Sequence, residues 1–203
     1  MKRLAFHLSA FLLCLSVGTA HATIIQYAAT LNGASEDPAN NSPATGFAKV
    51  WIDDATNMMT VTASFSGLTA KTTASHIHCC TAVPFEGKAG VATSLPTFPD
   101  FPLGVTSGNY TETFNLLSLS TYNNGFVTGN GGTVDSARLA FLAGLASGRA
   151  YLNIHTTAFP GGEIRGFLTE VPEPGSIALF GLGAAGFAAL RRRRGAGRSS
   201  PKL

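Results

Sequence analysis

The chain has 203 residues and a formal net charge of +3, but this charge is unevenly distributed. Most basic residues lie near the two ends, whereas residues 23–170 hold six Lys and Arg against ten Asp and Glu, a net formal charge of −4. Binding to nucleic acid requires a basic surface, so the acidic middle region excludes that class of partner. Its length is sufficient for one domain with its own hydrophobic core.

The N-terminus has the pattern of a secretory signal peptide, which we assign to residues 1–22. Lys2 and Arg3 supply the positive charge, residues 4–17 are apolar, and an A-x-A cleavage site lies directly before Thr23. The sequence therefore predicts export, processing by signal peptidase and a mature chain that begins near Thr23. Such a chain functions in an oxidising compartment.

The domain comprises residues 23–170. It is rich in Thr, Ser, Gly and small apolar residues, a composition that predicts strands joined by turns. A first strand is expected at residues 24–31, followed by a polar loop at 34–45. Residues 47–52 and 58–65 alternate between apolar and polar side chains, which predicts a hairpin of two half-buried strands.

The second half predicts further strands and one helix. Residues 83–103 hold four prolines and several phenylalanines, which indicates a long irregular loop packed by its own aromatic side chains. Residues 135–145 have helical spacing of apolar side chains and an N-cap residue. The remaining strands are expected at 73–78, 109–119, 149–155 and 163–169. This pattern predicts an all-β fold, an antiparallel immunoglobulin-like or Greek-key sandwich or barrel with one short helix.

Two of the predicted strands carry every histidine of the mature domain: His76, His78 and His155. Side chains alternate along a strand, so His76 and His78 share one face, and apolar neighbours directed into the core would place all three imidazoles on the outer face. Neighbouring strands would bring three imidazoles together as ligands of zinc, copper or iron, with one coordination position open. Alternatively, the imidazoles hold loops by hydrogen bonds. Ring nitrogens more than about 6 Å apart could not share one ion, since the bonds measure ~2.0–2.1 Å.

Glu163 and Arg165 share one face of the last predicted strand. The simpler interpretation is a charge pair that holds a neighbouring strand or loop. In the alternative interpretation Glu163 joins His76, His78 and His155 as a fourth metal ligand or as the partner of an imidazole N–H.

Cys79 and Cys80 directly follow the strand with the two histidines, and the mature chain has no other cysteine. A long-range disulfide within the chain is therefore excluded. Three states are consistent with the sequence: a disulfide between the two adjacent residues, disulfides to another chain, and ligation of a soft metal beside the histidines.

Three sequence strings together resemble the CHRD domain, a module named after chordin. They are A-S-H-I-H at 74–78, G-R-A-Y-L-N-I-H-T at 148–156 and F-P-G-G-E-I-R-G at 159–166, and the resemblance extends over about 26–168. It implies an immunoglobulin-like β-sandwich or barrel with a binding or structural role. No general enzymatic activity is implied.

The His-Ile-His pair is also similar to the copper-binding strand of Cu/Zn superoxide dismutase, another Greek-key barrel. That likeness implies an alternative function, a metal-dependent redox or hydrolytic enzyme with one zinc or copper ion. The chain has no recognisable zinc loop and none of the common hydrolase or nucleotide-binding motifs. We therefore predict a protein that is not an enzyme, and assign no catalytic residue.

The C-terminal segment, residues 171–203, contains Pro172-Glu173-Pro174, an apolar run at 176–190 and four arginines at 191–194. This order resembles the PEP-CTERM sorting signal of exosortase substrates. The apolar run predicts a C-terminal transmembrane helix that is short for the roughly 30 Å hydrocarbon core, with its arginines in the cytoplasm. The resemblance implies transient anchoring in the inner membrane, cleavage near the PEP motif, and display at the cell surface or in an extracellular, biofilm-type matrix. Extracellular polysaccharide and other surface proteins are then the expected partners.

Overall fold

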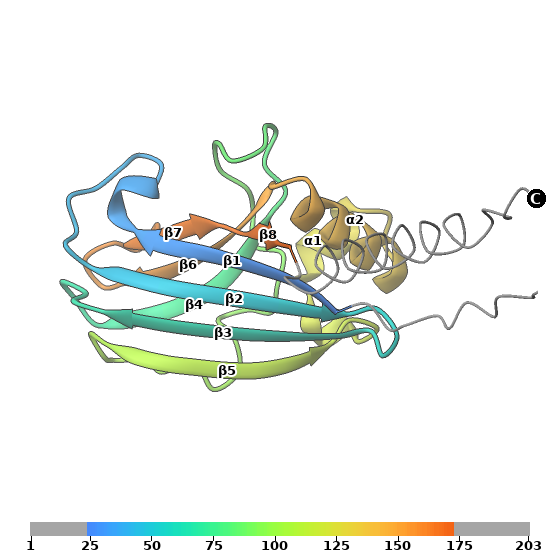
Figure 1. Cartoon of the computed structure of the whole chain (residues 1–203), viewed down its shortest axis with the longest axis horizontal. Helices are drawn as coiled ribbons and strands as arrows, with labels where there is room; N and C mark the ends of the chain where they lie inside the picture. Colours follow the sequence, from blue (N-terminus) through green and yellow to red (C-terminus); the bar gives the residue numbers. More distant parts are fainter. Residues whose placement is uncertain (1–23, 173–203) are drawn as a thin grey trace, which may run out of the picture.

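The computed structural model of the chain describes residues 24–172 (Figure 1). Eight strands form one sheet in the order β4-β6-β7-β1-β2-β3-β5, with β8 also paired to β1. All strand pairs are antiparallel. The strands are β1 (Ile24–Asn32), β2 (Thr45–Asp53), β3 (Met58–Ser66), β4 (Thr72–Cys79), β5 (Gly108–Asn115), β6 (Ala150–Thr156), β7 (Ile164–Phe167) and β8 (Thr169–Val171).

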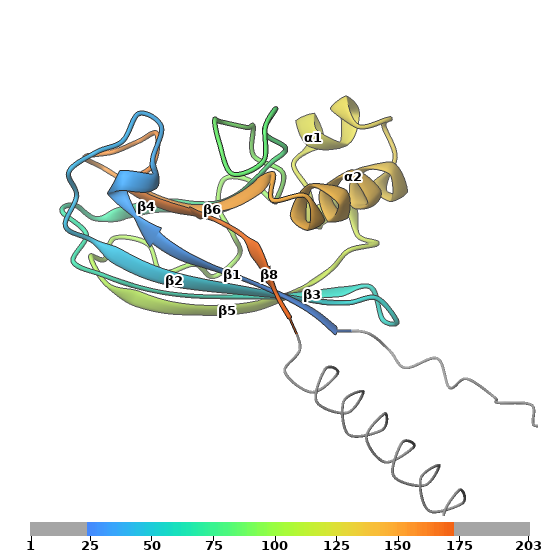
Figure 2. The same ribbon diagram turned by 45° about the horizontal axis from the view of Figure 1, so that its top comes forward.

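The sheet is strongly curled and has the form of a half-barrel. In Figure 2 the arm with β4 and β6 lies opposite the arm with β2, β3 and β5. In the strand order β7 and β1 connect the two arms. The predicted all-β antiparallel architecture with a short helical region is thus confirmed. The strands belong to one continuous sheet, so of the two predicted forms the structure is nearer to an open barrel, and an immunoglobulin-like relationship stays a prediction.

Alternation of side chains along the strands places the hydrophobic core between the two arms. In the β2–β3 hairpin, Val50 pairs with Val61 and both are fully buried. On the opposite arm Ile77 of β4 pairs with Leu152 of β6, and these two side chains are also fully buried in the same core. Apolar residues at every second position therefore hold the curled sheet together.

Two helices lie together at one end of the sheet (Figures 1 and 2). The predicted helix is present as α2 (Val134–Ala146), and the Thr133 hydroxyl caps it by accepting a hydrogen bond from Ser136 N. A shorter helix, α1 (Asn124–Gly129), was not predicted. Its sequence N-G-F-V-T-G reads as a loop, and its start depends on the Asn123 side chain, which accepts from Gly125 N at 2.9 Å.

The long segment between β4 and β5 lies along the free edge of β4. Backbone hydrogen bonds join it to that strand, from Ala92 N to Ile77 O and from Phe98 N to Ser75 O, each 3.0 Å long. The ring of Phe98 is fully buried and stacks on Tyr110 of β5. The prediction that this segment packs on its own aromatic residues is therefore wrong in part, because its phenylalanine enters the shared core.

Two predicted strands end differently in the structure. The run predicted at 109–119 ends at Asn115, whose side-chain oxygen accepts from Leu117 N at 2.8 Å and turns the chain into a short 3-10 helix, η2 (Leu119–Thr121). The run predicted at 163–169 is divided into β7 and β8. A second short 3-10 helix, η1 (Gly33–Ser35), follows β1.

Within residues 24–172, none of the helices has the length and apolar character needed to cross a membrane. The predicted signal peptide at 1–22 and the predicted transmembrane helix at 176–190 lie outside the described residues.

Candidate metal centre

The three histidines lie on β4 and β6, which are neighbours in the sheet. Ile77 and Leu152 face the core, so the neighbouring residues on each strand project from the opposite face. In this register His76 lies opposite Asn153, His78 opposite Tyr151, and His155 opposite Ala74.

The three imidazoles converge. Their ring centroids are 5.3 Å apart for His76 and His155, 5.7 Å for His78 and His155, and 5.9 Å for His76 and His78. One ring nitrogen from each residue lies within 4.8 Å of the other two. The nitrogens are thus closer than the 6 Å limit given above for a shared ion. Ring movements of about 1 Å would bring them to the roughly 3.4 Å separation of a tetrahedral site with ~2.1 Å bonds.

Each imidazole is held by a hydrogen bond between one ring nitrogen and a backbone carbonyl. His76 Nε2 donates to Pro96 O at 2.7 Å, and His78 Nδ1 donates to Ala89 O at 2.9 Å. His155 Nδ1 donates to the carbonyl of Pro160 at 2.9 Å. These bonds fix the tautomers, so the second nitrogen of each ring carries a free lone pair, as a metal ligand must.

Those second nitrogens are buried and have no hydrogen-bond partner: His76 Nδ1, His78 Nε2 and His155 Nε2. Burial without a partner is costly for a polar atom, and these three nitrogens are therefore available as acceptors for a ligand. Burial also lowers the pKa of His76 and of His78 to about 4, and lowers that of His155. All three rings are therefore neutral at neutral pH, the state in which imidazole coordinates a metal.

The face that carries the histidines was predicted to be the outer face, and it is indeed the face away from the core. It is nevertheless covered, and His76 and His78 are only 5% and 8% exposed. The loops that supply the carbonyls of Ala89, Pro96 and Pro160 cover it. A buried polar cluster at this place could not be predicted from strand alternation, since alternation does not show which loop folds over a sheet.

Glu163 is not part of the histidine cluster, which corrects the prediction of a fourth ligand. Its side chain is fully buried and accepts hydrogen bonds from the hydroxyls of Ser42, Thr69 and Thr156 and from Thr69 N, at 2.7 to 2.9 Å. Burial alone would raise the pKa of Glu163, but these bonds outweigh it and the pKa is lowered. Glu163 thus joins the loops beside β7 as an ionised carboxylate.

Arg165 does not pair with Glu163 either. Its Nε lies 3.8 Å from an oxygen of Glu36, and it donates to the backbone carbonyls of Ser35 and Gly87. Its guanidinium lies 4.6 Å from the centroid of the Tyr151 ring. The predicted charge pair on the last strand is therefore replaced by an ion pair between Arg165 and Glu36, in the chain after η1.

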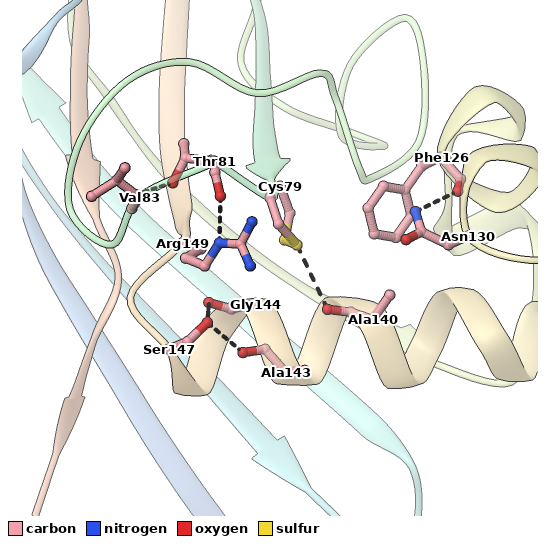
Figure 3. Close-up of a disulfide and its surroundings, with 11 residues drawn as sticks. Cys79, Thr81, Val83, Phe126, Asn130, Ala140, Ala143, Gly144, Ser147 and Arg149 are labelled. Atoms are coloured by element: carbon pink, nitrogen blue, oxygen red, sulfur yellow. Dashed lines mark hydrogen bonds between the residues drawn. A yellow bond between two sulfur atoms is a disulfide. The ribbon is translucent and has the colours of Figure 1, made fainter.

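Cys79 and Cys80 are joined to each other by a disulfide in this structure (Figure 3). The bridge lies on α2, where the Cys80 sulfur is 3.6 Å from the carbonyl oxygen of Ala140. A cavity of about 620 Å³ is lined by the disulfide, by α2 and by Arg149. Because both sulfur atoms are directed toward α2, the cysteines do not join the group of ligand atoms formed by the three histidines.

Fold and site together define a small antiparallel β-domain with a covered three-histidine cluster on one arm of its curled sheet. The chain belongs to the CHRD domain family, whose model matches residues 27–168. The model of the PEP-CTERM protein-sorting motif matches residues 170–194. No curated protein and no solved structure matches the chain.

The resemblances to the CHRD domain and to the PEP-CTERM signal are thereby confirmed. The PEP-CTERM motif identifies an exported protein that exosortase processes and that is sorted to the cell surface. The CHRD and PEP-CTERM families suggest a structural surface protein rather than an enzyme. The likeness of the His-Ile-His pair to Cu/Zn superoxide dismutase receives no support from these comparisons.

Proposed function

We propose that this surface protein displays a metal-binding CHRD domain, which holds one zinc or copper ion through His76, His78 and His155. Two observations carry the proposal: one ring nitrogen of each histidine lies within 4.8 Å of the other two, and each ring has a buried nitrogen without a hydrogen-bond partner. Hydrogen bonds to the other ring nitrogens account for how the loops are held, but not for three neighbouring imidazoles that each keep a buried nitrogen without a partner.

The choice of zinc or copper follows from the donor set. Neutral imidazole suits both ions, whereas calcium and magnesium require oxygen ligands. Glu163, the oxygen ligand that was predicted from the sequence, instead accepts hydrogen bonds from the hydroxyl groups of Ser42 and Thr156. Metal binding would then serve adhesion or assembly at the surface, with polysaccharide or another surface protein as partner, in line with the non-enzymatic character of both families.

The test is metal stoichiometry of the full-length exported chain, purified in detergent, stripped of metal and dialysed against Zn²⁺ or Cu²⁺. We expect one ion per chain in the wild type. Three variants, His76→Ala, His78→Ala and His155→Ala, should each weaken binding at least a hundredfold, because each removes one of only three protein ligands.

Thr111→Ala is the matched control, because Thr111 is exposed on β5, far from β4 in the strand order, and this variant should bind like the wild type. Circular dichroism of each metal-free variant establishes that it is folded. Absence of zinc and copper from the wild type, or equal binding by His155→Ala, would refute the proposal.

A further inference from the structure

Asn153 lies at the centre of the face that carries the histidines. It is the direct cross-strand neighbour of His76 on β4 and of Arg165 on β7. His155 follows two positions later on β6 and therefore projects from the same face. The His155 ring approaches both His76 and His78, so Asn153 shares one face of the sheet with all three imidazoles and is paired with His76 in the register.

The side chain of Asn153 is 2% exposed and only half satisfied. Its Nδ2 donates to the carbonyl of Gly161 at 3.4 Å, whereas its Oδ1 is buried without any partner. The backbone of Gly162 lies so close that a Cβ there would overlap the amide. The Pro160-Gly161-Gly162 turn thus fixes Asn153 as well as His155, and the orphaned oxygen is held in place rather than free to rotate toward another donor.

Three imidazoles leave at least one coordination position of zinc or copper unfilled. We propose that this position faces Asn153, and that Asn153 Oδ1 accepts a hydrogen bond from a water molecule bound to the metal there. This inference rests on the proposed metal site and adds a positioning residue for its exchangeable ligand. Four buried side-chain atoms of β4 and β6 have no hydrogen-bond partner: one nitrogen of each histidine and Asn153 Oδ1. The metal site accounts for the first three, and this inference accounts for the fourth.

The hydrogen-bond pattern determines which ligands the position prefers. Asn153 offers an acceptor, because its donor is used by Gly161 O. Arg165 is adjacent in the sheet, and two of its five N–H groups donate to Ser35 O and Gly87 O, while its Nε lies 3.8 Å from Glu36. A ligand with a hydrogen to donate, such as water, is therefore favoured over an anion that only accepts hydrogen bonds.

Azide is a suitable probe, since it binds metals but has no hydrogen to donate. The full-length chain in detergent is loaded with Co²⁺ in place of zinc, and the visible spectrum is titrated with azide. Asn153→Ala should bind azide about tenfold more tightly than the wild type, because the oxygen that favours water is gone. Asn153→Asp should bind azide about tenfold more weakly, because a carboxylate repels an anion.

Opposite signs for the two variants distinguish a hydrogen-bonding role from a structural one. Asn109→Ala, at an exposed position of β5, is the control and should match the wild type. Shifts of equal sign in both variants, or a wild-type spectrum that does not respond to azide, would overturn the inference while leaving the metal site intact. Failure of the wild type to bind Co²⁺, Zn²⁺ or Cu²⁺ would instead reject the proposed function itself.

Discussion

The phenol ring of Tyr151 stacks on the imidazole of His78, with the ring centroids 4.9 Å apart and the planes at 5°. β6, which carries Tyr151, lies between β4 and β7, so Arg165 of β7 approaches the phenol from the other side, 4.6 Å from its centroid. His78 is thus fixed twice, by this stack and by the Ala89 carbonyl. Residues that orient a ligand in this way contribute to metal affinity without touching the metal.

Removal of the stack should weaken metal binding. Tyr151→Leu is expected to reduce Zn²⁺ affinity about tenfold, within the range typical of residues that orient a ligand. Tyr151→Phe keeps the ring and loses only the two hydroxyl contacts to Ala89, one donated to Ala89 O and one accepted from Ala89 N, each 3.3 Å long, so its affinity should stay within about threefold of the wild type. Competition with a chelator measures both. Equal losses in the two variants would show that the hydroxyl, not the stack, matters.

Metal removal should destabilise the domain. Binding to the folded state alone stabilises it by about 2.7 kcal/mol when the free ion is at a hundredfold excess over its Kd. For a domain of this size that corresponds to a rise in Tm of about 5–10 °C. Calorimetry with Zn²⁺ and with EDTA measures the difference. His155→Ala should show no dependence of Tm on Zn²⁺, and a metal-dependent shift in that variant would contradict the assignment of its ligands.

Much of the fold was predictable because alternation of apolar residues is a local signal. Residues 47–52 and 58–65 predicted the β2–β3 hairpin, and the structure extends β2 by two residues at its start and one at its end, and β3 by one residue at its end. Local signals failed where a single side chain decides the conformation. Asn123 starts α1 and Asn115 ends β5, and either asparagine could equally stand in an ordinary loop.

The site was predictable in part for the same reason. The faces of His76, His78 and His155 follow from alternation, but their convergence depends on the β4–β6 pairing, which joins residues almost eighty positions apart. The histidine rings are held by the backbone carbonyls of Ala89, Pro96 and Pro160, and a backbone acceptor cannot be recognised from the type of its residue. Glu163 was misassigned because its partners Ser42, Thr69 and Thr156 are distant in sequence and common in type.

The sorting motif predicts a processing event. From the sequence we expect an extended motif, because Pro172 and Pro174 disfavour helix, and extended backbone is a conformation that a protease can bind. We expect cleavage close to this motif, so that the surface protein lacks the apolar run and the arginines. Glu173→Ala or Pro174→Leu should leave an uncut, membrane-bound form in cell fractions. Mass spectrometry decides the matter, and a surface protein whose C-terminus is Leu203 would show that the segment acts only as an anchor.

The Glu36 carboxyl predicts a pH dependence of stability. Burial raises its pKa from 4.5 to about 7 against the opposing effects of Arg165, of a hydrogen bond from the Asp37 backbone and of Lys88, while the Asp37 charge adds to the rise. The folded state therefore binds an extra proton between about pH 4.5 and 7, and its stability should fall as pH rises through this window. The loss amounts to at most about 3 kcal/mol. Urea unfolding at pH 5 and pH 8 measures it.

Glu36→Gln provides the control for that dependence. The amide does not titrate, so the variant should lose this component and be more stable than the wild type at pH 8. Asp37→Asn, the neighbouring carboxyl, should retain most of the dependence because Asp37 is only one of the charges that act on Glu36. An unchanged pH profile in Glu36→Gln would assign the effect to another group.

Gly144 allows the Cys79–Cys80 disulfide to lie against α2 (Figure 3). A Cβ at this position would overlap both sulfur atoms, and neither can move far because both belong to the bridge. Gly144→Ala should therefore destabilise the domain by about 1–3 kcal/mol, the usual cost of overpacking, despite the better helix propensity of alanine.

Gly129→Ala in α1 is the matched control, since a Cβ there meets nothing within 4 Å. That variant should be neutral or slightly stabilised in urea unfolding. If both variants unfold at the same urea concentration as the wild type, the contact between the disulfide and α2 does not contribute to the stability of the fold.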